Sequence, residues 1–261
     1  MGIEFDSGSM MRLSFEQPVE QGQLENELAS LGYVNAVIQY VQNTDGKDYY
    51  IRTADLDREQ KQGLQSALAA RFGGLEEQEF HDVSSEVAVE TARNAAIAVA
   101  VAALGILLYI SWAFHRMPNP FRYGTCALIA LAHDLLVVLG SFAILGSIFG
   151  WEINLMFITG VLAVIGYSVN NTVVIFDRIR ENLVRRVSSS FNVVANNSLV
   201  ETLSRSLNTS LTTLVVVVAL LLFVGASIQN FAVVLVIGVI AGTYSSICIA
   251  PMLLVAWEKE H

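Results

Sequence analysis

The sequence is poor in cysteine and in charge. Its two cysteines, Cys126 and Cys248, stand in separate apolar runs, and charged residues make up only 15% of the 261 residues. Neither cysteine belongs to a Cys-x-x-Cys pair or stands beside a group of histidines, so the sequence predicts no metal site and gives no basis for a disulfide. We expect both to behave as small, buried apolar side chains.

Catalytic and nucleotide-binding patterns are also lacking. The sequence has no nucleotide-binding motif, and no nucleophile stands with a base in a recognisable arrangement. We therefore expect no cofactor and no enzymatic activity.

Charge and apolar residues are unevenly distributed along the chain. Residues 1–93 hold 17 acidic and 7 basic residues, a net charge of −10, whereas residues 94–261 hold 7 acidic and 8 basic residues, a net charge of +1. Apolar residues make up 54% of the chain, which departs from soluble proteins in the direction of membrane proteins. The acidic front third argues against nucleic acid as a partner, because nucleic acid binding needs a basic surface.

Residues 1–90 have the pattern of a small α+β domain. Strand-like and amphipathic runs alternate, and an Asp45-Gly46 pair between two strand-like runs indicates a hairpin. The order β-α-β-β-α-β is that of a ferredoxin-like fold. The expected strands are 9–15, 34–41, 49–52 and 75–83, and the expected helices are 21–31 and 57–72.

Residues 91–261 hold five long apolar runs, and about 20 apolar residues suffice to cross a bilayer as a helix. The fourth is the weakest, because its unbroken apolar part covers only 214–224 and it must extend back through serines and threonines. The sequence therefore predicts an α-helical polytopic membrane domain. The predicted spans are 95–114, 123–148, 155–176, 205–225 and 231–257.

Basic residues predict the orientation of these spans. Arginines stand in the connections at 115–122 and 177–186, whereas the connections at 147–154 and 226–230 have no lysine or arginine. The positive-inside rule then places the C-terminus in the cytoplasm and residues 1–90 outside it. Residues 1–15 hold neither a signal peptide nor a span, so we expect a first transmembrane helix upstream of Met1. Unaided translocation of the N-terminal tail remains open as the alternative, although it suits short tails better than a folded domain.

Several polar groups stand inside the predicted spans, where they are costly and suggest function. His133 and Asp134 lie near the middle of the second span, and the third span holds Ser168, Asn170, Asn171 and Thr172. Two structural explanations remain open, namely that the amides and hydroxyls join helices through hydrogen bonds and that Arg205 anchors the fourth span at the interface.

Two further patterns concern the last two spans. Arg205, Thr209 and Thr212 follow the helical spacing i, i+4 and i+7, which puts them in one polar stripe. Gly238 and Gly242 form a Gly-x-x-x-Gly pattern, which is weak evidence for close contact between helices.

The motifs together resemble the SecF family. GYSVNNTVVIF at 166–176 followed by DRIREN at 177–182 is similar to the family signature GYSxNDTVVxxDRIREN. The signature positions that we single out are Asn170, Thr172, Asp177, Arg178, Arg180 and Glu181. Further similar stretches are AHD at 132–134, LSRSL at 203–207, TSLTT at 209–213, GTYSS at 242–246 and GIEFDSG at 2–8.

The resemblance implies a function. SecF proteins have six spans, and the one without a counterpart here is the first. They pair with SecD in an assembly of the RND (resistance–nodulation–division) type in the bacterial inner membrane. The implied role is to draw polypeptides outward after the SecYEG translocon, with YajC as a further partner, membrane lipids around the spans, and the proton gradient as the energy source.

One position departs from the family signature. The family has an acid where this chain has Asn171, which cannot titrate, so Arg205 loses the counter-ion that the resemblance implies. An engineered substitution and natural variation both remain open as explanations. The proton-relay candidates are then Asp134, with His133 beside it, and Arg205, with Asn171 at the position of the family acid.

Two other functions compete with gradient-driven export. A structural partner that docks SecD onto the translocon without carrying protons would agree with Asn171. An RND-type transporter of lipids or small molecules is disfavoured by the small exterior domain and by the SecF motifs.

Overall fold

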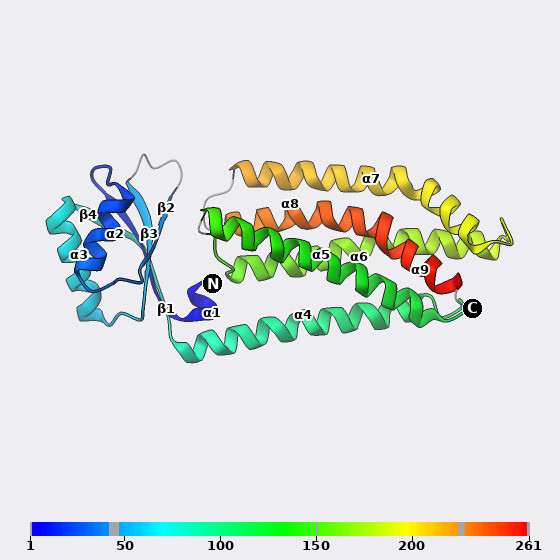
Figure 1. Ribbon diagram of the computed structural model, residues 1–261, viewed down its shortest axis with the longest axis horizontal. Helices are drawn as coiled ribbons and strands as arrows, with labels where there is room; N and C mark the ends of the chain where they lie inside the picture. The colour runs from blue at the N-terminus through cyan, green and yellow to red at the C-terminus, as the bar shows by residue number, and fades with distance from the viewer. Residues whose placement is uncertain (1, 42–46, 150, 224–227, 260–261) are drawn as a thin grey trace. The chain divides into compact units, whose positions relative to one another are not determined.

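A computed structural model describes residues 2–41, 47–149, 151–223 and 228–259. The chain forms two compact units, Met1–Ala95 and Ala96–His261, which are described separately here. The first is a small α+β unit and the second is a bundle of long helices (Figure 1). This confirms the predicted fold class.

The α+β unit is built on one four-stranded antiparallel sheet with the strand order β2-β3-β1-β4. Its element order is the predicted β-α-β-β-α-β, and the Asp45-Gly46 turn lies outside the described residues. The elements are β1 (Gly8–Phe15), α2 (Gln21–Ser30), β2 (Val37–Tyr40), β3 (Asp48–Thr53), α3 (Arg58–Phe72) and β4 (Leu75–Val83).

The core of this unit follows from the alternation of side chains along β1. Met11, Leu13 and Phe15 are buried on one face of the sheet, where they join the buried leucines of α2 and α3. Helix α3 begins at a capping box, in which the Asp57 side chain accepts from the Gln60 backbone and the Gln60 side chain accepts from the Asp57 backbone.

The sequence patterns missed one element, the short helix α1 (Ile3–Asp6). Four residues are too few to show a helical period. Its last residue, Asp6, pairs with Arg52 on β3, with 2.7 Å between the Asp6 Oδ2 and Arg52 Nη2 atoms.

The second unit contains five helical stretches that are long and apolar enough to cross a membrane. The fifth is composite, because a π-helical turn, η2, separates α8 from α9. The elements are α4 (Ser85–Ala113), which begins in the first unit, α5 (Pro120–Phe149), α6 (Leu155–Val184), α7 (Phe191–Phe223), α8 (Gln229–Tyr244), η2 (Ser245–Ile249) and α9 (Ala250–Lys259).

Three of these helices extend beyond the predicted spans by two turns or more, whereas the other two extend by three residues or fewer at each end. Helix α4 begins ten residues early, α6 ends eight residues late and α7 begins fourteen residues early. The additional turns are polar, and an apolar run marks only the part of a helix that crosses the hydrocarbon. The length of the helix therefore exceeds the length of the span.

Helices α6 and α8 form the centre of the bundle, with α5 and α7 packed against them (Figure 1). Helix α4 is the most peripheral by burial, with exposed apolar side chains that include Val101, Leu104, Leu108 and Trp112. Aromatic contacts support one part of the core, where Phe114 stacks on Tyr123 and both rings meet the edge or face of Phe176.

Candidate functional site

The most unusual polar group in the bundle is Asp134, halfway along α5. Its side chain is completely buried. The Asp134 Oδ2 atom accepts two hydroxyl hydrogen bonds, from Ser168 Oγ on α6 at 2.5 Å and from Ser245 Oγ on η2 at 2.8 Å. One carboxyl oxygen thus joins three segments that are distant in sequence.

The second oxygen of Asp134 faces its neighbour in the chain. His133 Nδ1 lies 3.2 Å from Asp134 Oδ1, and 35% of the His133 side chain is exposed. The His133 ring also lies 5.9 Å from the ring of Tyr244, measured between centroids. The imidazole therefore links the buried carboxyl group to the surface of the bundle.

Small residues on α8 bring the two serines to this carboxyl group. A Cβ atom on Gly238 would lie 2.1 Å from Val164 Cγ2, and one on Gly242 would lie 3.0 Å from Ser168 Cβ. The two glycines of the Gly-x-x-x-Gly pattern therefore lie at a close contact between α8 and α6, as the pattern indicated. Because α6 and α8 approach so closely, Ser168 and Ser245 can reach the same oxygen.

Ser245 is also positioned by the π-turn. The Ala250 N–H donates to the Ser245 carbonyl, which is the i to i+5 bond of a π-helix. The turn ends at Ile249, two residues before Pro251, which has no N–H and whose ring disfavours a regular α-helical turn. Turns of this kind are frequent at functional sites.

Asn171 belongs to a second polar cluster, one turn further along α6. It is buried, and its Nδ2 lies 3.2 Å from Ser210 Oγ on α7. Tyr167 Oη and Thr243 Oγ1 lie 2.9 Å and 2.7 Å from the same Ser210 oxygen. Since the Thr243 hydroxyl donates to the Val239 carbonyl, Ser210 can donate to Thr243 and accept from the other two.

Arg205 lies apart from Asn171. The Arg205 side chain is exposed, and it has no ion pair or hydrogen bond with any described residue. The expected stripe runs along the outer side of α7, where Thr209 and Thr212 hydroxyls donate to backbone carbonyls of their own helix. The buried face of α7 carries different residues, namely Ser198, Thr202, Ser206 and Ser210.

The charged residues of the signature lie at the end of α6. Arg178 donates to Glu201 on α7 at 2.5 Å and also pairs with Glu181. Asn182 Nδ2 donates to the same Glu201 oxygen at 2.9 Å. Glu201 is thus a partner that the sequence patterns missed, because nothing in its own helix distinguishes it from a solvated surface residue.

The other signature residues are less closely linked to α7. Arg180 pairs with Asp177 at 2.6 Å within α6. Thr172 is buried and its hydroxyl donates to the Ser168 carbonyl at 3.3 Å, whereas Asn170 is exposed.

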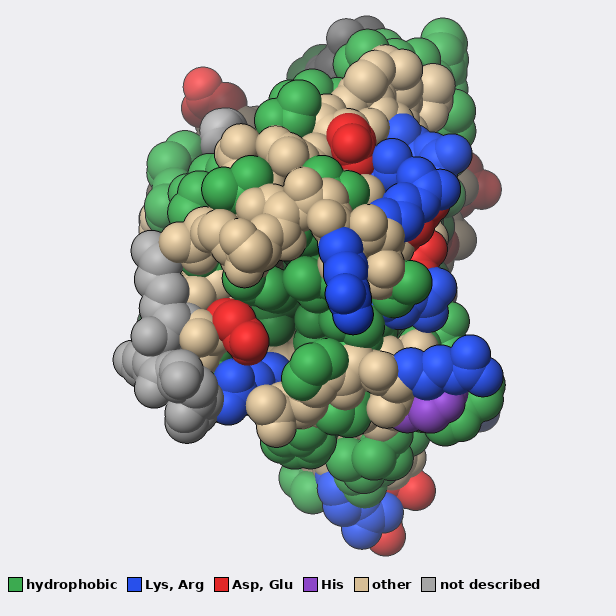
Figure 2. Space-filling view, turned by 90° about the vertical axis from the view of Figure 1, so that its right-hand side faces the viewer, with side chains coloured by type: hydrophobic (Ala, Val, Ile, Leu, Met, Phe, Trp, Pro, Cys, Tyr) green, Lys and Arg blue, Asp and Glu red, His purple; other side chains and the backbone are tan. Residues whose placement is uncertain are grey.

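Basic side chains gather at the end of the bundle where α4 and α6 end. Figure 2 looks onto this end and shows a concentration of Lys and Arg side chains. Arg122, at the start of α5, pairs with Glu258 on α9 at 3.4 Å and lies over the Trp257 ring. The arginines of this end are Arg116, Arg122, Arg178, Arg180, Arg185 and Arg186.

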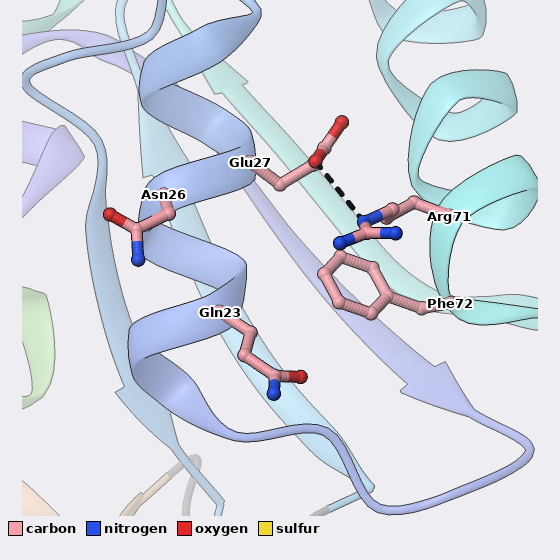
Figure 3. Close-up of a pocket in the computed structure, with 5 residues that line it drawn as sticks. All are labelled: Gln23, Asn26, Glu27, Arg71 and Phe72. Carbon is pink, nitrogen blue, oxygen red and sulfur yellow. Dashed lines mark ion pairs between the residues drawn. The ribbon is translucent and has the colours of Figure 1, made fainter.

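The α+β unit has a polar pocket of about 370 Å³ between α2 and α3 (Figure 3). Gln23, Asn26 and Glu27 line it from α2, and Arg71 and Phe72 line it from α3. Glu27 Oε2 and Arg71 Nε lie 3.6 Å apart across it. None of the sequence-predicted site residues lines this pocket.

Comparison with known proteins agrees with the motifs. Residues 64–260 match the family described as "Protein export membrane protein SecD/SecF, C-terminal". The "Protein translocase subunit SecF" of Thermobaculum terrenum is 44% identical over 269 residues, which cover 100% of this chain and 85% of that protein. The "Protein translocase subunit SecF" of Anaerolinea thermophila is 38% identical and is covered to 84% of its length.

A solved structure resembles both the fold and the sequence. The crystal structure of SecDF, a translocon-associated membrane protein from Thermus thermophilus, has a TM-score of 0.86 and 32% sequence identity. The match covers 98% of this chain and 34% of that chain, so this chain spans about a third of the SecDF length. With five apolar helices of membrane-spanning length, the chain is a multi-pass membrane protein, and it belongs to the SecD/SecF family of protein export membrane proteins.

Proposed function

We propose that this chain is a transport subunit, rather than an enzyme, that assists Sec-dependent export of unfolded polypeptides and is driven by the proton gradient. Its proposed partners are SecD, the SecYEG translocon, YajC and the surrounding lipids. SecD is supported by the SecDF protein of Bacillus subtilis, which is 33% identical to this chain over 34% of its own length.

The observation that carries the gradient-driven mechanism is the environment of Asp134. A carboxyl group at the middle of a span must be neutral, paired or hydrated, and such groups mark ion pathways by default. Asp134 is completely buried among hydroxyl donors from two other segments, and His133 connects it toward the surface. One charge that crosses the potential yields about 2.3 kcal/mol per 100 mV, which is enough to bias a conformational change.

The distribution of arginines supports an orientation in the bacterial inner membrane. Arg116 lies in the connection between α4 and α5, Arg122 lies in the first turn of α5, and four arginines stand at the end of α6. The positive-inside rule places this end and the C-terminus in the cytoplasm. The α+β unit is then exterior, where an emerging polypeptide would meet it.

A second function is favoured by a different observation. Asn171 cannot titrate, and Arg205 has no acidic partner among the described residues. A subunit with these features could dock SecD onto the translocon and leave proton movement to its partner. This alternative predicts that Asp134 can lose its carboxyl group without loss of gradient stimulation.

An export assay in membrane vesicles separates the two functions. Wild type, Asp134→Asn and Asn171→Asp are each combined with SecD and SecYEG, and export is measured before and after collapse of the proton gradient. We expect the export rate of Asp134→Asn with the gradient present to equal the rate measured after the gradient is collapsed. Ser206→Ala is the matched control, because the Ser206 hydroxyl is buried in α7 and has no hydrogen-bond partner in the described part of the chain.

Two outcomes would favour the docking function. In the first, the proton gradient stimulates export by Asp134→Asn as much as export by wild type. In the second, the gradient stimulates export equally in all variants, so that Asn171→Asp shows no more stimulation than wild type. Loss of export in the presence and absence of the gradient would instead indicate a folding defect, which the amount of intact protein in the membrane detects.

A further inference from the structure

The hydrogen bonds of Asp134 depend on its protonation state. Its Oδ2 atom accepts from two hydroxyls, Ser168 Oγ and Ser245 Oγ, an arrangement that fits an ionised carboxylate, which has no hydrogen of its own to donate. A protonated carboxyl group must donate one hydrogen. If that hydrogen is on Oδ2, one of the two serines has to become an acceptor.

Ser245 is the serine that can change partner. Its Oγ atom already lies 3.4 Å from the Gly242 carbonyl oxygen, one turn earlier in the same helix. Ser168 Oγ has no second hydrogen-bond partner among the described residues. Serine bonds to a preceding carbonyl of the same helix alter its bend, so a change at Ser245 acts directly on the local helix geometry.

Ser245 is also the first residue of η2, the one interruption in the fifth span. The segment after it begins with Ala250 and Pro251, which cannot continue the regular helical hydrogen bonds through the proline nitrogen. The turn therefore relies on contacts outside its own backbone, and the Asp134–Ser245 hydrogen bond is one of them.

We propose that Asp134, Ser168 and Ser245 form a proton-dependent latch between α5, α6 and η2. The ionised carboxylate holds η2 against α5 and α6. On protonation, Asp134 donates to Ser245 Oγ and the Ser245 hydroxyl turns to the Gly242 carbonyl. A weaker neutral hydrogen bond then replaces a charge-assisted one, which loosens η2 so that α9 can move relative to α8. The latch is a mechanism for proton coupling within the proposed function, and its role in export rests on that function.

Other titratable groups near the latch are few in the described part of the bundle. His133 is next to Asp134 on α5, and Tyr244 contacts His133 from α8. On α6, Tyr167 is next to Ser168 but directs its hydroxyl to Ser210. A pH response of η2 must therefore be assigned to Asp134, His133 or Tyr244 by substitution.

The native Cys248 within η2 allows a direct test. It is partly exposed, whereas Cys126 is fully buried, so a trifluoromethyl reagent should label Cys248 selectively. The labelled protein in lipid nanodiscs is followed by fluorine NMR from about pH 4 to pH 9, a range that covers carboxyl and imidazole titration. We expect two signals whose ratio changes with pH in wild type.

The variants assign this response. Asp134→Asn, whose amide resembles the protonated acid, should give the low-pH signal at every pH, and Ser245→Ala should lose the change in ratio. Ser206→Ala, the matched control, should keep the wild-type response. The latch is overturned by a pH-independent wild-type signal, by an unchanged response in Asp134→Asn, which assigns the response to His133 or Tyr244, or by loss of the response in Ser206→Ala.

This test does not use export, so the two proposals can fail separately. A titrating latch without gradient-stimulated export would contradict the proposed function alone. The latch alone would be contradicted if gradient-stimulated export depends on Asp134 but the fluorine signal of labelled Cys248 does not change with pH.

Discussion

Asn171 Nδ2 on α6 lies 3.2 Å from Ser210 Oγ on α7, so the position of the family acid is occupied by an amide that joins two helices. Arg205, the implied counter-ion, lies on the outer face of α7. Asn171 therefore takes part in helix packing in this chain, within a cluster that also includes Tyr167 and Thr243.

Replacement of this amide with an acid should be costly. Asn171→Asp removes the N–H donor to Ser210 and introduces a buried carboxyl group without a cation at contact distance among the described residues. We expect the free energy of unfolding to fall by about 1–3 kcal/mol at pH 8. The loss should be smaller at pH 5, because the protonated acid is neutral like the amide. Unfolding in mixed micelles at the two pH values measures this difference, and equal losses would contradict the explanation.

The contact between α6 and α8 leaves no room for a side chain at Gly238. Gly238→Ala places a Cβ atom 2.1 Å from Val164 Cγ2, and the β-branched valine is stiff. We expect a loss of about 1–3 kcal/mol in the free energy of unfolding. Gly140→Ala on α5 is the control, because nothing lies within 4 Å of the added Cβ atom. A control that is destabilised as much as Gly238→Ala would rule out steric contact as the cause.

An acidic pair in the α+β unit predicts a pH-dependent stability. Repulsion from Asp82 raises the pKa of Asp55, and smaller contributions come from partial desolvation, a hydrogen bond to Asp82 and repulsion from Asp57. Because the folded pKa is the higher one, protonation of Asp55 favours folding. The stabilisation is complete below the unfolded pKa and is lost as the pH rises through the folded pKa.

Asp55→Asn removes this repulsion. It should therefore raise the stability of the sheet at pH 7 and leave it unchanged below about pH 3.5, where the native acid is already protonated. Hydrogen exchange of the β1 and β4 amides in the whole protein measures the effect. Asp57→Ala is a contrasting variant, since loss of the capping box should lower stability by about 1 kcal/mol at pH 7. Faster hydrogen exchange in Asp55→Asn than in wild type at pH 7 would mean that the sheet is destabilised, which contradicts the prediction.

Hydropathy and periodicity were sufficient to predict the β-α-β-β-α-β order and the five long apolar helices, but not the four-residue helix α1. They could not predict the π-turn, because one additional residue in a helical turn leaves the apolar pattern of the fifth span intact. They also could not predict which face of α7 is buried. That helix has apolar or hydroxyl residues on most sides, so the choice of Ser206 and Ser210 over Arg205 depends on packing against α6 and α8.

The hydrogen-bond partners of Asp134 also could not be predicted from the sequence. Ser168 is 34 positions away and Ser245 is 111 positions away, and neither spacing has a local signal. Gly238 and Gly242 indicated a close helix contact but not its partner. The carboxyl group became a specific site only when α5, α6 and η2 were seen to meet at one oxygen.

The most direct test of the account is whether Asp134 takes up a proton inside the bundle. Infrared difference spectra of the protein in nanodiscs, recorded at successive pH values, detect the carbonyl band of a protonated carboxyl group. We predict a band that appears as the pH falls and that is absent in Asp134→Asn. A band that persists unchanged in Asp134→Asn, or no titrating band in wild type, would contradict the assignment of Asp134 as the proton-binding group.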